Sequence, residues 1–413
     1  MTREDTKPIS LYISKSYLTS ESNKTGNWRF LKPRYHEKTA PCSVACPAAE
    51  DISRIQLLTT RGLFKEAWET ILLENPFPAV CGRICHHPCE RVCNRREFDE
   101  AVAIHTIERF LGETAVRDGL KPSFERLSAR KQRIAVVGAG PGGLAAAYFL
   151  ARLGYSCDVY EAMAEPGGAP GWGIPPYRLA VAAMQEEIAR IEELGVNLYC
   201  GRAVPEDFPE QAKDSYDAVF FGGVRRPERR PGVPGEPPAG VKDGAAFLQR
   251  VKKGEKPALT GTVAVLGGGN TAVDVARSAV RLGAKALIIY GGRRQDMPAF
   301  ENEVRMALEE GVELLEFRTP LKINAENSEF RLTLQRMKTL EVDAREGTSA
   351  IPDPGKTETI RVSRIFRADD AEAAEPWVPP ESGEGALAMA YTRLLRTDGG
   401  LPVVFGGAVR QAR

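Results

Sequence analysis

Residues 133–161, RIAVVGAGPGGLAAAYFLARLGYSCDVYE, decide the fold of this chain. The apolar start, residues 134–137, is typical of a buried parallel strand, and the glycines that follow have the G-x-G-x-x-G spacing. An Ala- and Leu-rich helix pattern, a second apolar strand and the acidic Glu161 come next. A glycine-rich turn alone would be a weak signal, but the complete order of strand, turn, helix, strand and acidic tip predicts a dinucleotide-binding unit.

The residues of this first turn have separate tasks in such a unit. The first glycine permits a tight turn, the second lets the backbone approach a pyrophosphate, and the third lets the helix pack on the strand. The N–H groups and the positive dipole end of the helix attract phosphates. Glu161 is placed to accept hydrogen bonds from ribose hydroxyls. The turn residues expected at the cofactor are Gly138, Gly140, Pro141, Gly142 and Gly143.

Composition bounds the class of protein. A chain of 413 residues is too long for one core and predicts two or three domains. The net charge of +1 disfavours binding to nucleic acid or a membrane surface, and no apolar run approaches the ~20 residues of a membrane span. The charged residues 1–10 lack a signal-peptide core, so we expect a cytoplasmic protein. Eight cysteines in a reducing compartment indicate metal or redox chemistry.

Six of these cysteines gather in one region, as a C-x3-C-P motif followed by four cysteines at every fourth position. Residues 51–74 between them have the apolar period of one helix. Gly82 and Pro88 interrupt the helical pattern, so we expect a looped, cup-shaped backbone around an iron–sulfur cluster. Zinc is the competing metal, and a site without metal is a third alternative. The six are Cys42, Cys46, Cys81, Cys85, Cys89 and Cys93.

Residues 167–179 are so rich in glycine and proline that we expect neither helix nor ladder strand there. Because a long ordered loop usually has a task, we expect its backbone at Gly167 and Gly168 to pass close to a flat ring or a pyrophosphate. Arg178 is then expected near a phosphate. The alternative is an ordinary surface loop.

The opening pattern recurs at residues 262–290, TVAVLGGGNTAVDVARSAVRLGAKALIIY. Gly267, Gly269 and Ala272 fill the G-x-G-x-x-A positions. An internal repeat of a mononucleotide-binding unit predicts two nucleotide cofactors that face one another, which is the architecture of a flavin enzyme fed by a nicotinamide. Residues 331–340 and 357–366 alternate apolar and polar side chains, as the strands of an antiparallel flap do.

The tip of the second copy carries Tyr290 where the first carries Glu161. No carboxylate is present there to bind a ribose 2′-hydroxyl. Arg293 and Arg294 follow and could pair with the 2′-phosphate of NADP. The alternative is an exposed basic loop.

Taken together, these motifs resemble the glutamate synthase small-subunit family of FAD- and NAD(P)H-dependent oxidoreductases. The resemblance covers about residues 35–407 and rests on the cysteine-rich region, G-A-G-P-G-G-L-A-A-A, I-P-P-Y-R-L, P-G-V-P-G-E, G-G-G-N-T-A-V-D and R-R-x2-M-P-A. It implies an α-helical iron–sulfur domain followed by two Rossmann-like α/β domains, the second inserted into the first. The expected domains are an arm at 1–35, the helical cysteine-rich domain at 36–125, the FAD-binding domain at 126–256 and 371–413, and the NAD(P)-binding domain at 257–370.

The resemblance also implies where the cofactors bind. FAD is expected on Gly138, Gly140, Gly143, Glu161 and Gly168, and the nicotinamide cofactor on Gly267, Gly269, Asn270, Thr271 and Asp274. The family's closing F-x-G-G-D motif places Gly407 at the flavin, but here Ala408 replaces the aspartate, so that FAD is held less completely or a partner covers that face.

Two further departures from the family change the expectations. Two family cysteines are absent from residues 34–41, so we expect one [4Fe-4S] cluster. Its favoured ligands are Cys46, Cys85 and Cys89, and the fourth ligand is another cysteine or a group such as Glu108. Only one of the two arginines that select NADP in the family aligns here, so NAD is expected at least as readily as NADP.

The expected activity is hydride exchange between NAD(P)H and FAD, with electrons passing to or from iron–sulfur centres. Such chemistry needs stacked rings rather than a catalytic side chain. The expected partners are iron–sulfur and catalytic subunits of a larger complex, for example one that handles aldehydes, carboxylic acids or ferredoxin. The alternatives are the small subunit of NADPH-dependent glutamate synthase and a non-catalytic flavin scaffold. A thiol–disulfide reductase is disfavoured because Cys157 and Cys200 are isolated.

Overall fold

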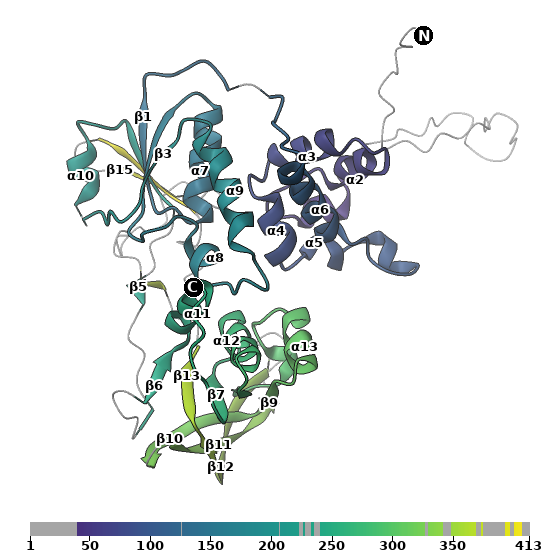
Figure 1. The fold of residues 1–413 in the computed structure, drawn as a ribbon, viewed down its shortest axis with the longest axis vertical. Helices are drawn as coiled ribbons and strands as arrows, with labels where there is room; N and C mark the ends of the chain where they lie inside the picture. The colour runs from purple at the N-terminus through teal and green to yellow at the C-terminus, as the bar shows by residue number, and fades with distance from the viewer. Residues whose placement is uncertain are drawn as a thin grey trace, which may run out of the picture. The chain divides into compact units, whose positions relative to one another are not determined.

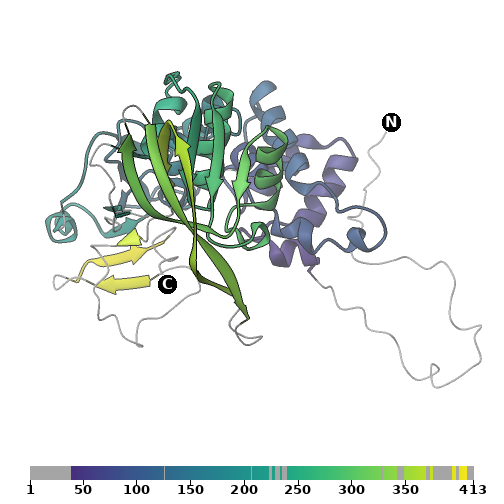
Figure 2. The same cartoon turned by 90° about the horizontal axis from the view of Figure 1, so that it is seen from below.

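The computed structural model describes residues 39–124, 126–205, 207–222, 226–227, 233–234, 240–326, 329–341, 348–368, 373–374, 393–396 and 400–406 (Figures 1 and 2). The chain forms two compact units, Met1–Phe124 and Glu125–Arg413. The arm expected at 1–35 and the expected flavin contact Gly407 lie outside the described residues. Within the described residues, no helix has the length and apolar character needed to cross a membrane.

The described part of the first unit contains helices and the loops between them, and no strands. Its elements are α1 (Pro41–Ala45), α2 (Ile52–Thr60), α3 (Phe64–Leu72), α4 (Pro78–Ile84), α5 (Pro88–Arg91), the 3-10 helix η3 (Asn94–Glu97) and α6 (Ile104–Arg117). The single helix predicted for residues 51–74 is wrong, because a turn at Gly62 separates α2 from α3. Gly62 has φ of +73°, a conformation that ends a helix. The break predicted at Pro88 is confirmed, since α4 ends before Cys85 and α5 begins at Pro88. The break predicted at Gly82 is wrong, because Gly82 lies inside α4.

The cysteine-bearing α4 packs unusually closely on α6. A Cβ on Gly82 would lie 2.4 Å from the Arg109 nitrogen, and a Cβ on Gly112 would lie 2.6 Å from the Ala79 nitrogen. Only glycine allows the two backbones to approach in this way. The fully buried Trp68 of α3 and Leu111 of α6 belong to the core of the same unit. The cysteine segment is therefore fixed against α6, which carries Glu108.

The first sheet of the second unit has the strand order β15-β16-β4-β1-β2-β3. Its strands are β1 (Arg133–Val137), β2 (Ser156–Tyr160), β3 (Asn197–Tyr199), β4 (Ala218–Phe221), β15 (Arg393–Arg396) and β16 (Pro402–Phe405). Helix α7 (Pro141–Arg152) packs against β1 and β2, and α9 (Val181–Glu192) packs against α7. Strand β16 returns late in the chain to pair in parallel with β4. This return confirms that the second nucleotide fold is inserted into the first.

The second sheet has the order β6-β13-β7-β8-β9, with every neighbouring pair parallel. Its strands are β6 (Val241–Asp243), β7 (Thr262–Leu266), β8 (Lys285–Ile289), β9 (Glu313–Leu315) and β13 (Arg364–Arg367). The helices between these strands are α11 (Gly244–Lys252), α12 (Asn270–Arg281) and α13 (Glu301–Glu309). Strand β6 lies before residue 257, where we expected this domain to begin, so the inserted fold starts earlier. Strand pairing, rather than the glycine motif, sets that boundary.

A three-stranded antiparallel flap adjoins this sheet, as Figure 2 shows. It consists of β10 (Arg318–Glu326), β11 (Glu329–Glu341) and β12 (Thr348–Val362). The flap is confirmed, but the strand predicted at 357–366 is wrong at its end, because Phe366 belongs to β13 of the parallel sheet. Ser363 makes the break between the strands, and its Oγ donates to the carbonyl of Thr262 at 2.8 Å. The short elements are α8 (Gly168–Trp172), α10 (Phe208–Ala212), η4 (Arg294–Asp296), β5 (Arg226–Pro227) and β14 (Ala373–Ala374).

Candidate functional site

The first glycine turn, residues 138–143, has the predicted geometry. Gly138 follows β1 with φ of +94°, and α7 begins at Pro141 with Gly140 as its N-cap. A Cβ on Gly143 would lie 1.9 Å from the Gly138 carbonyl oxygen, so no larger residue fits there. The backbone N–H groups at this helix start are suited to a pyrophosphate. These contacts with FAD remain predictions.

Glu161 has a structural task that sequence analysis missed. Its Oε2 accepts the backbone N–H of Ala139 at 2.8 Å, and its Oε1 accepts the backbone N–H of Met163 at 2.8 Å. The buried carboxylate therefore braces the first turn. Each oxygen keeps a lone pair that could accept a hydroxyl donor, so the expected ribose contact stays a prediction.

Residues 167–179, the bridging segment, begin against the first turn. The N–H of Gly167 donates to the Ala139 carbonyl at 2.7 Å, and Gly168 packs directly on Gly140. The expectation of no helix here is wrong, because α8 forms one short turn. Gly167 and Gly168 have φ of +116° and +57°, and the conformational freedom of glycine lets the chain turn into α8 despite its composition.

The second glycine turn, residues 267–272, repeats this construction. Gly267 has φ of +134°, and Gly269 is the N-cap of α12. The side chain of Asn270 accepts the Phe300 N–H at 3.0 Å, which ties the turn to the start of α13. The Tyr290 ring lies on the turn, because a Cβ on Gly268 would come within 2.4 Å of that ring.

A cavity of about 430 Å³ opens where β7 and β8 end, at the second turn. Nucleotides bind beyond the carboxyl ends of parallel strands, and this volume is within the range of ligand pockets. Arg318 and Arg367 also line the cavity and were missed from the sequence, because they belong to β10 and β13, strands far along the chain from the glycine turn. Arg318 is paired with Glu358 at 2.7 Å. The lining residues are Val233, Leu266, Gly267, Gly268, Ile289, Tyr290, Gly291, Arg318, Thr319, Pro320 and Arg367.

The two arginines after the second tip have protein partners. Arg293 Nε lies 2.9 Å from Asp296 Oδ2, and the backbone N–H of Arg294 donates to Glu316 Oε1 at 2.5 Å. Neither residue is among those that line the cavity. A contact with the NADP 2′-phosphate therefore stays a prediction, and for Arg293 it would compete with Asp296.

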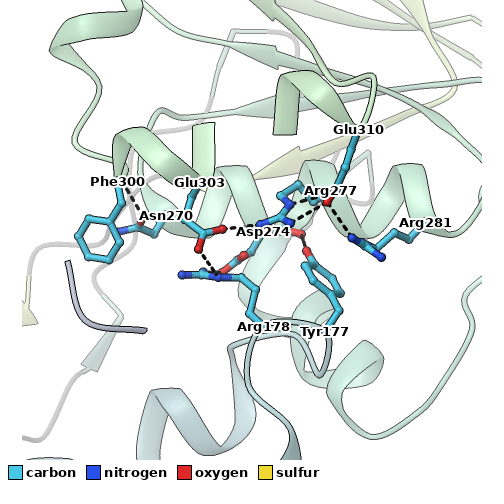
Figure 3. Close-up of polar contacts among 9 residues, drawn as sticks. All are labelled: Tyr177, Arg178, Asn270, Asp274, Arg277, Arg281, Phe300, Glu303 and Glu310. Atoms are coloured by element: carbon cyan, nitrogen blue, oxygen red, sulfur yellow. Dashed lines mark hydrogen bonds and ion pairs between the residues drawn. The ribbon is translucent and has the colours of Figure 1, made fainter. Parts of the chain in front are cut away.

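Arg178 also has partners that sequence analysis missed. Its Nη1 lies 2.5 Å from Asp274 Oδ2 and its Nε lies 3.0 Å from Glu303 Oε1, as Figure 3 shows. Burial, reinforced by the charge of Glu303, raises the pKa of Asp274 to about 6, although Arg178 opposes the shift. The structure thus brings two predicted cofactor residues, Arg178 and Asp274, into contact with one another. Their contacts with a phosphate and a nicotinamide remain predictions.

The first unit brings together the three favoured cluster ligands. The thiol charges of Cys46, Cys85 and Cys89 act on one another, and burial raises the pKa of each, that of Cys89 to about 12. The backbone N–H of His87 donates to Cys85 Sγ at 3.4 Å. Cysteine thiolates that also accept a backbone N–H are suited to hold an iron–sulfur cluster, and this ligand set stays a prediction. Burial, with a smaller contribution from the charge of Cys93, raises the pKa of Cys42, and Cys81 Sγ donates to Asn75 Oδ1 at 3.7 Å.

Two buried carboxylates lie beside these sulfurs. Asn75 Nδ2 donates to Glu50 Oε1 at 2.9 Å and to Glu108 Oε1 at 2.8 Å. The charges of both glutamates act on Cys46 and Cys85 and raise their thiol pKa values. Glu108 was expected as a possible fourth ligand, whereas Glu50 and Asn75 were missed because their partners are distant in sequence. Three thiols and a carboxylate oxygen form a donor set that fits one cluster.

A second group of donor atoms lies nearby, on His87, Glu90 and His105, within 4.8 Å of one another. Glu90 Oε1 accepts a hydrogen bond from the backbone N–H of His105 at 3.0 Å. The same oxygen lies 2.7 Å from Nδ1 of the His105 ring, at hydrogen-bond distance. The two imidazole rings stack with centroids 3.9 Å apart. Stacked rings do not aim their lone pairs at one ion, so this group ties α5 to α6.

Two family models match the chain. Residues 132–345 match the pyridine nucleotide-disulphide oxidoreductase family, and residues 33–120 match the model described as dihydropyrimidine dehydrogenase domain II, 4Fe-4S cluster. The two matches cover, respectively, the unit with both glycine turns and the unit with the clustered cysteines.

Several curated relatives are about one-third identical to the chain. The NADPH-Fe(3+) oxidoreductase subunit beta of Geobacter sulfurreducens is 33% identical over 378 residues, which cover 89% of this chain and 56% of that protein. The NADP(+)-dependent formate dehydrogenase subunit beta of Moorella thermoacetica is 36% identical over 344 residues, 77% of this chain and 49% of that one. The chain thus spans about half the length of these relatives. The glutamate synthase [NADPH] small chain of Halomonas elongata is 31% identical over 351 residues, 81% and 74% of the two chains.

Among solved structures, Mycobacterium tuberculosis FprA in complex with NADPH resembles the chain with a TM-score of 0.55. The likeness covers 68% of this chain and 80% of FprA at 17% sequence identity. A similarity at such low sequence identity shows that the two proteins share a fold and nothing more.

Proposed function

Because this chain belongs to the pyridine nucleotide-disulphide oxidoreductase family, in the branch that includes glutamate synthase small chains, we propose that it is the flavin subunit of a larger oxidoreductase. The chain has an FAD- and NAD(P)H-binding domain and a 4Fe-4S domain. In the proposed reaction, hydride passes between NAD(P)H and FAD, and electrons pass between the flavin and iron–sulfur centres.

One observation carries this proposal: two glycine turns of the phosphate-binding type lie in one compact unit, and one segment links the first turn to the helix that begins at the second. The bridging segment contacts Gly140 of the first turn through Gly168, and its Arg178 pairs with Asp274 of α12. A protein that merely stored one nucleotide would need neither the second turn nor the link. Paired turns instead suit a pair of dinucleotides that react with one another.

The residues of the chain bind and position rather than exchange protons. When bound, FAD would accept hydride and release electrons one at a time, which is the chemistry that the cofactor itself supplies. The two glycine turns supply N–H groups to pyrophosphates. Cys46, Cys85 and Cys89, with a fourth ligand from Glu50, Glu108 or another cysteine, would hold the cluster.

Partner subunits complete the proposal. The relatives from Geobacter and Moorella are named as beta subunits, and the described parts of this chain are taken up by the two nucleotide folds, the flap and the cysteine-rich unit. We infer that an organic or inorganic substrate is handled by a partner that exchanges electrons with this subunit in the cytoplasm. Glutamate synthase is a second candidate complex, favoured by the 74% coverage of the Halomonas small chain.

An anaerobic titration of the full-length protein tests the proposal. We expect the flavin absorbance to bleach when NADH or NADPH is added, and we expect iron and acid-labile sulfide to co-purify with the flavin. Flavin-loaded protein that neither nicotinamide bleaches would support the scaffold alternative and overturn hydride exchange. Subunits that co-purify from the native host would distinguish a glutamate synthase from another oxidoreductase.

A further inference from the structure

Three consecutive residues at the end of the bridging segment contact the inserted nucleotide fold. The guanidinium carbon of Arg281 lies over the Tyr177 ring, 4.1 Å from the ring centroid. Arg178 pairs with carboxylates of α12 and α13. The carbonyl of Leu179 accepts a hydrogen bond from Lys252 Nζ of α11 at 2.6 Å. The segment is therefore attached to three different helices of the inserted fold.

The ion pairs of Arg178 belong to a larger network, drawn in Figure 3. Glu303 pairs with both Arg178 and Arg277. Arg277 Nη2 lies 2.7 Å from Glu310 Oε1, which also pairs with Arg281 at 2.7 Å. With Asp274 included, the network contains three arginines and three carboxylates, so its formal charges cancel.

Burial gives this network its rigidity. The side chain of Arg277 is 1% exposed and those of Arg178 and Asp274 are 7% and 5% exposed. An exposed ion pair contributes little to stability and breaks easily. Removing one member of a buried pair leaves an uncompensated buried charge and is strongly destabilising. The network therefore strongly disfavours any movement that separates Arg178 from α12 and α13.

The other end of the bridging segment is equally constrained. Gly168 packs on Gly140 of the first turn, and the N–H of Gly167 donates to Ala139. One short segment thus fixes the first glycine turn to the helix that begins at the second. Since Arg178 comes from the first fold and its partners come from the second, the network links the two folds (Figure 3).

We propose that Arg178, Glu303 and Lys252 are positioning residues that hold the inserted fold in one orientation, so that nicotinamide and flavin meet without a rotation of that fold. This inference rests on the proposed hydride exchange. Hydride transfer depends steeply on the distance and alignment of the reacting atoms, and a displacement of about 1 Å can cost about 100-fold in rate. Loosening the network should therefore slow the transfer, while each glycine turn keeps its own nucleotide.

A matched pair of substitutions on α13 tests this. Glu303→Gln removes a carboxylate of the network. Glu309→Gln removes a carboxylate that pairs with Arg305 on the surface, where the side chains of Arg305 and Glu309 are 57% and 60% exposed. In rapid mixing of the full-length, flavin-loaded protein, we expect Glu303→Gln to lower the limiting rate of flavin reduction by about tenfold or more. The Kd for the nicotinamide and the flavin content should stay within about twofold to threefold. Glu309→Gln should match the wild type.

Two further variants keep the test decisive if Glu303→Gln does not fold. Lys252→Met removes a buried charge and its bond to Leu179 without leaving an ion unpaired, so it should fold and should slow reduction at saturating nicotinamide. Arg178→Lys retains the charge and should recover part of the rate that Arg178→Met loses. Unchanged limiting rates in Lys252→Met and Arg178→Met would overturn the positioning role.

The failure of this inference differs from the failure of the proposed function. If the wild type is not bleached by NADH or NADPH, hydride exchange itself is wrong. If the wild type is bleached and the network variants react at its rate, only the positioning role is wrong. A rate loss that follows flavin loss in proportion would also contradict it, because a positioning residue lowers the rate of fully loaded protein.

Discussion

Gly168 lies so close to Gly140 that a Cβ on Gly168 would come within 2.7 Å of the Gly140 Cα. The reverse approach is looser, since a Cβ on Gly140 would be 3.8 Å from Gly168. Gly168 also has φ of +57°, in the left-handed region. The start of the bridging segment is therefore seated on the first turn by contact between two backbones.

The substitution Gly168→Ala should weaken FAD binding by about tenfold or more, because the methyl group pushes the bridging segment away from the first turn. The flavin-to-protein ratio after purification and the Kd for added FAD measure this. Gly201→Ala is the control: Gly201 has φ of +70° with no heavy atom within 4 Å of the added Cβ. Equal flavin loss in both variants would assign the effect to backbone strain alone.

The substitution Gly268→Ala should weaken nicotinamide binding and leave FAD in place, since its Cβ would meet the Tyr290 ring at 2.4 Å. We expect the Kd for NADH or NADPH to rise about tenfold or more. Tyr290→Leu removes the ring, so the double variant should recover affinity compared with Gly268→Ala. Failure of the double variant to recover would place the nucleotide elsewhere.

Serine substitutions of Cys46, Cys85 and Cys89 should each remove most of the iron, because these cysteines are the proposed cluster ligands, and burial together with their charges raises the thiol pKa values of Cys85 and Cys89. Iron per protein chain and the broad visible absorbance of the cluster measure the loss. Cys157→Ser is the control, as Cys157 is buried in β2 of the other unit. Iron loss in Glu108→Gln as well would assign the fourth ligand to that carboxylate.

The pH dependence of stability should reveal the buried Lys252. Burial lowers the pKa of Lys252 to about 8 from its ordinary value of 10.5. The folded state therefore binds fewer protons than the unfolded state between these values, and stability rises with pH there. Compared with Lys252→Met, the wild type should gain on the order of 2–3 kcal/mol of unfolding free energy from pH 8 to 10.5. Urea denaturation at several pH values measures this, and parallel curves would contradict it.

The parts of the fold that depend on neighbouring residues could be predicted from the sequence. Both glycine turns, their strands and their helices follow from a spacing of a few residues, because the turn conformation requires glycine wherever it occurs. The interruption after Cys85 followed in the same way from Pro88, whereas Gly82 lies inside α4 and does not break it.

Features that depend on distant residues could not be predicted. The pair of Arg178 with Asp274 joins positions 96 residues apart, and Asn75 joins Glu50 to Glu108, which lie 25 and 33 residues from it in the sequence. The apolar pattern of the sequence also continues across the short breaks at Gly62 and Ser363, so the pattern alone does not reveal where one element ends and the next begins. In these places tertiary contacts, rather than local preference, decide the structure.

The late position of β16 has a consequence for how the protein is made. Strand β4 lies between β1 and β16, but β16 leaves the ribosome only after every strand of the inserted sheet. During translation the β4 edge therefore stays open while the inserted fold becomes complete. An open edge is a template for wrong pairing. A nascent chain stalled before residue 393 would expose this edge to chaperones, although its nicotinamide half had already matured.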